Sequence, residues 1–430
     1  MQLLKHADLL VYDGEWRILK NGYVGIAGDT ICYVSSIRPK QEFEAEKDLS
    51  GHLLMTGFYN MHTHTSMTLL RGLGSGLPLD RWLHEAMFPI EARLTQADIS
   101  VGTRLAMMEM LACGVVSFTD MYDMPHITAE EVLQAGMRAS VCRPLLALNE
   151  NEPYESNWRV PASRELYANY NGAGDGRLIV DFGIHAEYTS HAAQVRQYGE
   201  ECMRAGARMH LHLSETRKEH EGCKARYGKT PTRWFYELGV LDNPTIAAHC
   251  VMVEPDDIKL MLEKGVTCVH NPSSNMKLGS GFMPMQMLLD SGVHLTIGTD
   301  GAASNNNQNL MEEIHIASII HNGYTGDPTI IKPEILLLMA TKNAAAAQGR
   351  EDCGELAVGK KADLIAVRLD TPHMMPAHDI PALLVYSAQA SDIAMTMVGG
   401  KTLYENGIYH TIDFERVKFD LKETNNRLFG

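Results

Sequence analysis

The sequence contains no apolar run of the roughly 20 residues that a membrane-spanning helix needs. Residues 1–13 carry charges and form no apolar core, so we expect no secretory signal peptide. The eight cysteines include no Cys-x-x-Cys pair, which predicts reduced thiols in a cytoplasmic protein. The chain also lacks an excess of positively charged residues. Its formal net charge of −15 argues against a nucleic acid or an anionic membrane surface as partner.

What the chain does contain is typical of a soluble globular enzyme: 430 residues, 45% hydrophobic and 21% charged. Eight apolar, strand-like runs alternate with longer amphipathic stretches such as 98–112, 192–205, 256–264 and 284–290. The eight runs span 54–61, 115–121, 139–146, 178–185, 208–213, 245–249, 266–270 and 293–299. Their continuous apolar character indicates strands buried on both faces, so the pattern predicts an α/β fold, a (β/α)8 TIM barrel.

Both ends of the chain have a different pattern. Short strand-like segments joined by Gly and Asn turns occur at 9–12, 23–27 and 30–34, and strand character returns at 363–367, 394–398 and 401–404. We expect residues 1–52 and 351–430 to pair into one small composite β-sandwich domain beside a catalytic barrel formed by residues 53–350.

Polar side chains close several of the predicted barrel strands. His62 and His64 lie two apart, so on a strand they point to the same face. Other predicted strands end in histidine or aspartate, namely in His185, His212, His249 and Asp300. In a barrel of this type the active site lies at the C-terminal edge of the strands, so these side chains are expected to meet there.

The residue types divide by chemistry. Three nitrogens and one oxygen make a ligand set that suits Zn²⁺ and that Fe²⁺ also accepts, and we assign it to His62, His64, His212 and Asp300. A metal with a free coordination position can lower the pKa of a water molecule to about 7.

Three catalytic roles follow from that assignment. Glu215 lies three residues beyond His212, beside the metal rather than on it, as a general acid/base should. His249 is expected to orient the water or to stabilise developing negative charge. Asp300 is expected to accept a proton from the water in addition to binding the metal.

The fourth predicted strand, 178–185, contains no lysine. Dinuclear hydrolases of this architecture carry a carbamylated lysine there that bridges two metals. The sequence therefore favours a single metal ion per subunit.

Four segments resemble one known family. They are Met55–Gly72 (MTGFYNMHTHTSMTLLRG), His270–Gly279 (HNPSSNMKLG), Gly298–Asn306 (GTDGAASNN) and Gly354–Ala366 (GELAVGKKADLIA). The likeness is to the amidohydrolase superfamily and, within it, to the S-adenosylhomocysteine / 5′-methylthioadenosine deaminases, and it spans nearly the whole chain.

This resemblance implies a metal-dependent deaminase that converts 5′-modified adenosines (S-adenosylhomocysteine, 5′-methylthioadenosine, adenosine) to inosine analogues and ammonia. An aminohydrolase of a guanine, pterin or triazine ring is the first alternative, because those enzymes share much of the pattern. A barrel that binds a metal or a nucleoside without turnover is the second. The resemblance also implies association into a homo-oligomer.

The resemblance further implies a set of substrate contacts, in which Glu215 carries protons to the ring. Glu91 would accept hydrogen bonds from ribose hydroxyls, the alternative being a solvated carboxylate at a helix start. His185 would contact the nucleoside. The distal group of the substrate, such as a homocysteine carboxylate, would be held by Arg143 and by Arg159 or Arg164. Trp82 would cover the ligand or simply pack, and Ser304 would contact the base.

Overall fold

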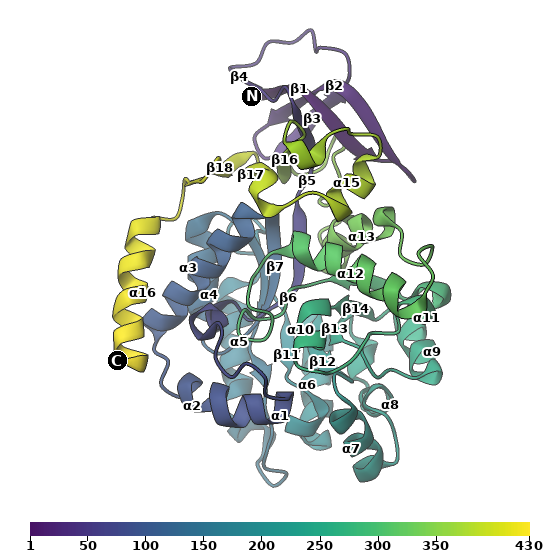
Figure 1. Cartoon of the computed structure of the whole chain (residues 1–430). Helices are drawn as coiled ribbons and strands as arrows, with labels where there is room; N and C mark the ends of the chain where they lie inside the picture. The colour runs from purple at the N-terminus through teal and green to yellow at the C-terminus, as the bar shows by residue number, and fades with distance from the viewer.

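The computed structural model describes residues 1–430, and its barrel follows the predicted alternation of strands and helices (Figure 1). The strand positions are β6 (Phe58–Thr63), β7 (Val115–Met121), β8 (Arg138–Cys142) with β9 (Pro144–Leu145), β10 (Leu178–Val180) with β11 (Phe182–Ile184), β12 (Met209–Leu213), β13 (Thr245–His249), β14 (Thr267–His270) and β15 (His294–Ile297). All pair in parallel, and nearly every residue in them is buried. The predicted (β/α)8 barrel is confirmed.

The barrel closes where β15 meets β6. The backbone N–H of Asp300 donates to the carbonyl oxygen of His62 at 2.8 Å. Gly298 permits this approach, because a Cβ atom at that position would lie 2.6 Å from the backbone nitrogen of His62. The closure therefore brings the chain after β15 directly against the histidines at the end of β6.

Helices surround the barrel and form its rim. The larger ones are α3 (Gln96–Ala112), α4 (Pro125–Ala135), α5 (Arg159–Tyr170), α6 (Ala192–Ala205), α7 (Arg217–Tyr227), α8 (Pro231–Glu237), α9 (Pro255–Lys264), α11 (Met285–Ser291), α12 (Leu310–Thr325) and α13 (Pro333–Ala340). Short segments follow β6 at the rim: η1 (Thr65–Leu70), α1 (Leu79–Arg81), η2 (Trp82–Met87) and α2 (Phe88–Glu91). In Figure 1, α1 and α2 lie at the end of the barrel opposite the N-terminus.

Both ends of the chain contribute strands to one nine-stranded sheet beside the barrel. It contains β1 (Gln2–Tyr12), β2 (Trp16–Ala27), β3 (Thr30–Ser35), β4 (Ala45–Asp48), β5 (His52–Thr56), β16 (Leu364–Arg368), β17 (Ile393–Val398), β18 (Lys401–Glu405) and β19 (Ile408–Tyr409). Its 15-residue apolar core is separate from the 91-residue core of the barrel, which supports treating it as its own unit.

Two expectations about the domain borders differ from the structure. The run 54–61 is not one barrel strand, because it divides at Gly57 into β5 and β6. β5 pairs with β1 and β16, so the border expected between residues 52 and 53 falls inside a strand of the small sheet. A Cβ atom on Gly57 would lie 2.2 Å from a methyl carbon of Val116, so the crossing point between the domains leaves no room for a side chain.

The second difference is in the segment 351–430, which is not all sheet. It also contains α15 (Ile380–Tyr386) and α16 (Phe414–Phe429), which pack against barrel helices. In Figure 1, α16 lies beside α3 along the barrel wall. The hydroxyl of Thr424 and the guanidinium of Arg427 donate to the buried carboxylate of Asp98 on α3. None of the helices combines the length and the hydrophobicity that a membrane crossing requires.

Candidate active site

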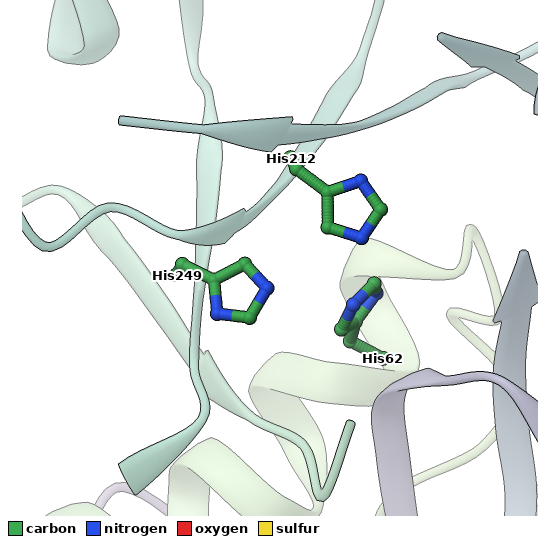
Figure 2. A group of neighbouring side chains, drawn as sticks. All are labelled: His62, His212 and His249. Atoms are coloured by element: carbon green, nitrogen blue, oxygen red, sulfur yellow. The ribbon is translucent and has the colours of Figure 1, made fainter. Parts of the chain in front are cut away.

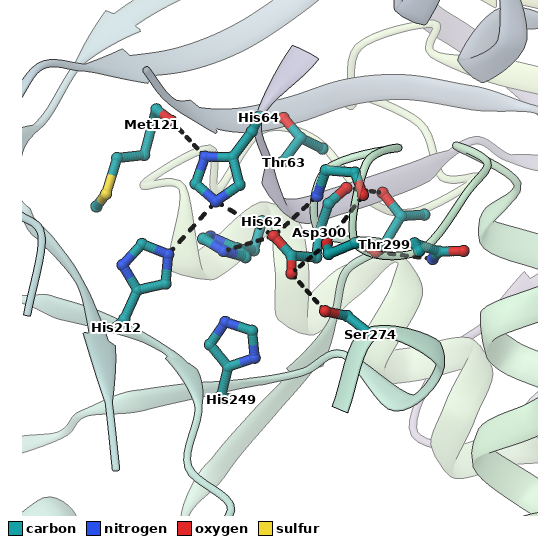
Figure 3. Close-up of polar contacts among 12 residues, drawn as sticks. His62, Thr63, His64, Met121, His212, His249, Ser274, Thr299 and Asp300 are labelled. Carbon is teal, nitrogen blue, oxygen red and sulfur yellow. Dashed lines mark hydrogen bonds and ion pairs between the residues drawn. The ribbon is translucent and has the colours of Figure 1, made fainter. Parts of the chain in front are cut away.

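Side chains from four strands meet at the C-terminal end of the barrel. Figure 2 shows the imidazoles of His62, His212 and His249 turned toward one another, and Figure 3 adds His64 and Asp300. The Nε2 atoms of His62 and His64 lie 3.3 and 3.2 Å from Oδ1 of Asp300. The Nε2 atoms of His64 and His212 are 3.4 Å apart. The structure thus brings together the four ligands expected from the sequence.

Hydrogen bonds made by Nδ1 orient the imidazole rings of the expected metal ligands. Nδ1 of His64 donates to the carbonyl oxygen of Met121 at 2.5 Å, and Nδ1 of His212 donates to that of His185 at 2.7 Å. A proton on Nδ1 leaves the lone pair of Nε2 free to bind a metal. Nδ1 of His62 lies 2.9 Å from Nε2 of His210, so the inward-facing His210 supports His62 from behind.

The carboxylate of Asp300 is held from the opposite side. Its Oδ2 accepts hydrogen bonds from the hydroxyls of Ser274 at 2.6 Å and Ser304 at 2.8 Å. Its Oδ1 accepts the backbone N–H of Gly301 and faces the two histidines. One carboxylate oxygen is therefore anchored by hydroxyls while the other points at the centre of the cluster.

The donor set fits a divalent cation. Nε2 of His62 is fully buried and makes no hydrogen bond, although Oδ1 of Asp300 lies 3.3 Å away, and such a nitrogen is costly unless a bound group satisfies it. Burial lowers the pKa of His62 to about 4, so the ring is neutral as metal ligation requires. For His64, burial lowers the pKa but the facing Asp300 carboxylate outweighs it, and the pKa rises to about 9. A cation bound between these groups would replace that proton.

A second possible ligand group overlaps the first. The nitrogens of His62, His212 and His249 also lie within 4.8 Å of one another. Nδ1 of His249 is 2.8 Å from Oδ1 of Asn275, and its Nε2 is 3.9 Å from Oε2 of Glu215. His249 thus lies between the expected metal ligands and the carboxylate of Glu215, which is expected to transfer protons.

Glu215 is buried beside this cluster, and burial raises the pKa of its carboxyl group. Such a group changes its protonation closer to neutral pH than an ordinary glutamate does, which suits general acid/base work. Four non-glycine residues at or just after the ends of strands here have left-handed backbones: Ser214 (φ 49°), His249 (φ 74°), Cys250 (φ 48°) and Asp300 (φ 62°). Backbone strain of this kind concentrates at functional sites.

These groups line a cavity of about 190 Å³ that also contains several predicted substrate contacts. Trp82, Glu91, His185 and Ser304 all lie in its wall. The hydroxyl of Tyr122 donates to Oε1 of Glu91 at 2.6 Å, and burial raises the pKa of that carboxyl group. Nε1 of Trp82 is buried without a partner, so an acceptor on a ligand would satisfy it.

The three arginines named from the sequence all form ion pairs. Neither Arg143 nor Arg159 lines the cavity, because both guanidiniums turn to the carboxylate of Asp123. Arg164 pairs with Glu155 and Glu201 away from the cavity. Of the two candidates for the second arginine, Arg159 is therefore the one beside the site.

Sequence reasoning missed Tyr122 and Asp123, which also line the cavity. Both follow β7 directly, so the rule that pointed to polar residues after the other strands would have found them.

The chain matches known proteins over nearly its whole length. Residues 53–403 match the model of the amidohydrolase family. A protein of Moorella thermoacetica named 5-methylthioadenosine/S-adenosylhomocysteine deaminase is 39% identical over 96% of each chain. A 5'-deoxyadenosine deaminase of Methanosarcina acetivorans is also 39% identical, over 96% of this chain and 95% of its own.

Solved structures agree on the fold. An adenosine deaminase from Xanthomonas campestris with bound zinc superimposes with a TM-score of 0.93 and 29% identity, covering 99% of this chain and 98% of its own. A guanine deaminase from C. acetobutylicum shares the fold at a TM-score of 0.84 and 20% identity, covering 94% of this chain and 100% of its own. Together with the His-Asp cluster, the zinc in the first of these supports a divalent metal in the site described above.

Proposed function

This chain belongs to the amidohydrolase family, and from that premise we propose that it is a zinc-dependent deaminase of 5′-modified adenosines. The products would be the corresponding inosine analogues and ammonia. The observation that carries the proposal is that Glu215 and Glu91 line one cavity together with three members of the cluster, His64, His212 and Asp300. The names of the relatives, which act on 5-methylthioadenosine, S-adenosylhomocysteine or 5'-deoxyadenosine, support the substrate class.

One zinc ion per chain would be held by Nε2 of three histidines and by Oδ1 of Asp300, the histidines being His62, His64 and His212. Bound there, the ion would supply an activated water molecule and positive charge. Fe²⁺ would accept the same ligands. The hydrogen bonds to Nδ1 of His64 and His212 hold the rings in the required orientation.

Glu215 would move the protons. In its ionised form it would take one proton from the water and give it to N1 of the adenine ring. The second proton of that water, left on the oxygen attached to C6, would then pass through the same carboxylate to the amine, which leaves as ammonia. The hydroxyl of Ser280 lies 3.4 Å from its Oε1 and helps to orient the carboxylate. His249, whose Nδ1 donates to Oδ1 of Asn275, would orient the water that attacks C6 through its Nε2.

Glu91 would accept hydrogen bonds from the hydroxyl groups of the ribose. One of its oxygens is occupied by the hydroxyl of Tyr122, which fixes the carboxylate and leaves the other oxygen free for sugar hydroxyls. His185 and Trp82 would contact the nucleoside from the cavity wall, and Ser304 lies near the base side next to Asp300.

The alternative is an aminohydrolase of a guanine, pterin or triazine ring, and Glu91 discriminates between the two. The experiment is a panel of adenosine, 5′-methylthioadenosine, S-adenosylhomocysteine, guanine and pterins on one metal-quantified preparation of wild type and Glu91→Ala. We expect turnover of the adenosines and a large loss of it in the variant. Glu85→Ala is the matched control, because Glu85 is exposed and pairs with Arg81 outside the cavity. No turnover of any adenosine compound would end the proposal.

We also place the protein in the cytoplasm and propose that it forms a homo-oligomer. The cytoplasmic assignment is supported by its eight cysteines, none of which forms a disulfide. Light scattering coupled to size exclusion would test the oligomeric state.

A further inference from the structure

Two consecutive residues of the short helix α10 (Pro272–Lys277) contact side chains that follow two different barrel strands. Oγ of Ser274 donates to Oδ2 of Asp300 at 2.6 Å (Figure 3), and Oδ1 of Asn275 accepts a hydrogen bond from Nδ1 of His249 at 2.8 Å. Asn275 is only 1% exposed and does not line the cavity. Its side chain therefore reaches the site only through His249.

The helix that carries Asn275 is itself held in place by buried contacts. The backbone N–H of Ser273 donates to Oε2 of Glu313 at 3.1 Å. Nζ of Lys277 donates to the carbonyl oxygen of Ala303 at 3.0 Å. These two bonds fix α10 to α12 and to the chain that follows β15, so the carboxamide of Asn275 is presented to His249 in one position.

The amide oxygen determines which nitrogen of His249 carries the proton. A carbonyl oxygen can only accept a hydrogen bond, so the proton lies on Nδ1 and Nε2 keeps its lone pair. Nδ2 of Asn275 is buried without a partner, so the amide contacts the imidazole through its oxygen alone. His249 therefore offers an acceptor at Nε2.

That acceptor lies beside a second one. Nε2 of His249 is 3.9 Å from Oε2 of Glu215, which in its ionised form also only accepts. Two acceptors do not bond to each other, but one water molecule that donates hydrogen bonds of about 2.8 Å to both of them spans about 4 Å. Both protons of such a water would be held, and its oxygen would keep its lone pairs for the attack on C6.

We propose that Asn275 is a positioning residue for the deamination: it keeps the proton of His249 on Nδ1, so that Nε2 of His249 and the carboxylate of Glu215 together orient the attacking water. This inference rests on the proposed deaminase function. It adds to that function a residue that contacts neither the substrate cavity nor the expected metal ligands.

The variants Asn275→Leu and Asn275→Asp test the role of the acceptor oxygen. Leucine has a similar shape and no acceptor, so we expect kcat for 5′-methylthioadenosine to fall roughly 10- to 100-fold, with KM and the metal content unchanged, because the imidazole can then place its proton on either nitrogen. Aspartate keeps the acceptor and should stay within about fivefold of wild type. If Asn275→Asp lost as much kcat as Asn275→Leu, the inference would be wrong.

A double-mutant cycle with His249→Ala separates positioning from a general structural role. With enzyme concentrated until the residual rate of His249→Ala is measurable, adding Asn275→Leu should change that rate by less than about twofold. The same loss in both backgrounds would show that Asn275 does not act through His249 and would overturn the inference.

Asn322→Leu is the matched control for the substitution of a buried amide. Asn322 lies on α12 outside the cavity and also has a buried amide atom without a partner, so this variant should keep the kcat of wild type. A fall in kcat for Asn322→Leu equal to that for Asn275→Leu would contradict a specific role for Asn275. An active wild type with an unaffected Asn275→Leu variant would overturn the inference alone, whereas a wild type that turned over no adenosine compound would overturn the deaminase function with it.

Discussion

The carboxylate of Glu219 holds the turn that carries Glu215. It accepts the backbone N–H of Glu215 at 2.7 Å and that of Ser214 at 2.9 Å, using one oxygen for each. Glutamine at this position would present an NH₂ group to one of these donors. We expect Glu219→Gln to lower kcat roughly 10- to 100-fold with little change in KM, because a small displacement of a catalytic group is costly. Steady-state kinetics with metal analysis measures this.

The control for that experiment is Glu221→Gln, which alters an exposed carboxylate on the same helix. It should behave as wild type. If Glu219→Gln kept full kcat, or lost its metal, the positioning role assigned to Glu219 would be wrong.

Glu215→Gln separates catalysis from binding. Glutamine keeps the shape of the side chain but cannot carry a proton, and general acid/base groups contribute about 10²- to 10⁴-fold to a rate. We expect a loss of kcat in that range with the metal content of wild type, measured by ammonia release and elemental analysis. A variant that stayed within a few fold of wild type would mean that another group moves the protons.

Glu313 should contribute a stabilisation of the folded protein that decreases as the pH rises from 5 to 7. Burial raises the pKa of this carboxyl group from 4.5 to about 7. The folded protein therefore keeps a proton that the unfolded chain releases, and this favours folding below pH 4.5 and is lost as the pH rises through 7. The contribution between pH 5 and pH 7 is about 2 kcal/mol.

The variant Glu313→Gln isolates that contribution, because glutamine does not titrate. Loss of a hydrogen bond from Ser273 or Asn305 would change the free energy of unfolding by the same amount at every pH. Urea unfolding of both proteins at pH 5, 6 and 7 should give a smaller pH dependence for the variant. Parallel curves would show that Glu313 titrates normally in the folded protein.

A buried ion pair joins the barrel to the small sheet. Arg138 on β8 donates through Nε to Oδ2 of Asp363 at 2.7 Å, and both side chains are buried. Arg138→Leu should destabilise the protein by about 3–5 kcal/mol, because it leaves the Asp363 carboxylate buried without its partner. The double variant Arg138→Leu/Asp363→Leu should recover part of this loss in urea unfolding, and a single variant as stable as wild type would refute the prediction.

The barrel and its cluster of ligands were predictable from sequence because each depends on a local pattern. The helix expected at 192–205 has the bounds of α6, and the strands expected at 115–121 and 245–249 have those of β7 and β13. Parallel strands point their C-terminal ends to one edge, so residues such as His212 and Asp300 could be placed together from their positions alone.

What could not be predicted depends on contacts between distant segments. The division at Gly57 is set by the pairing of β5 with β1 and β16, which no local pattern reveals. α16 is held by a bond to Asp98 more than 300 residues earlier in the chain. The direction of Arg143 and Arg159 is likewise set by Asp123, and a side-chain direction of this kind is not encoded by spacing.

Titration of zinc into chelator-treated enzyme, with deamination of 5′-methylthioadenosine followed at each step, tests the central claim most directly. The account predicts no activity without metal, a linear rise, and a plateau at one equivalent per chain, because the two possible ligand groups share His62 and so cannot each hold an ion. A plateau at two equivalents, or no ammonia release at any loading, would contradict it.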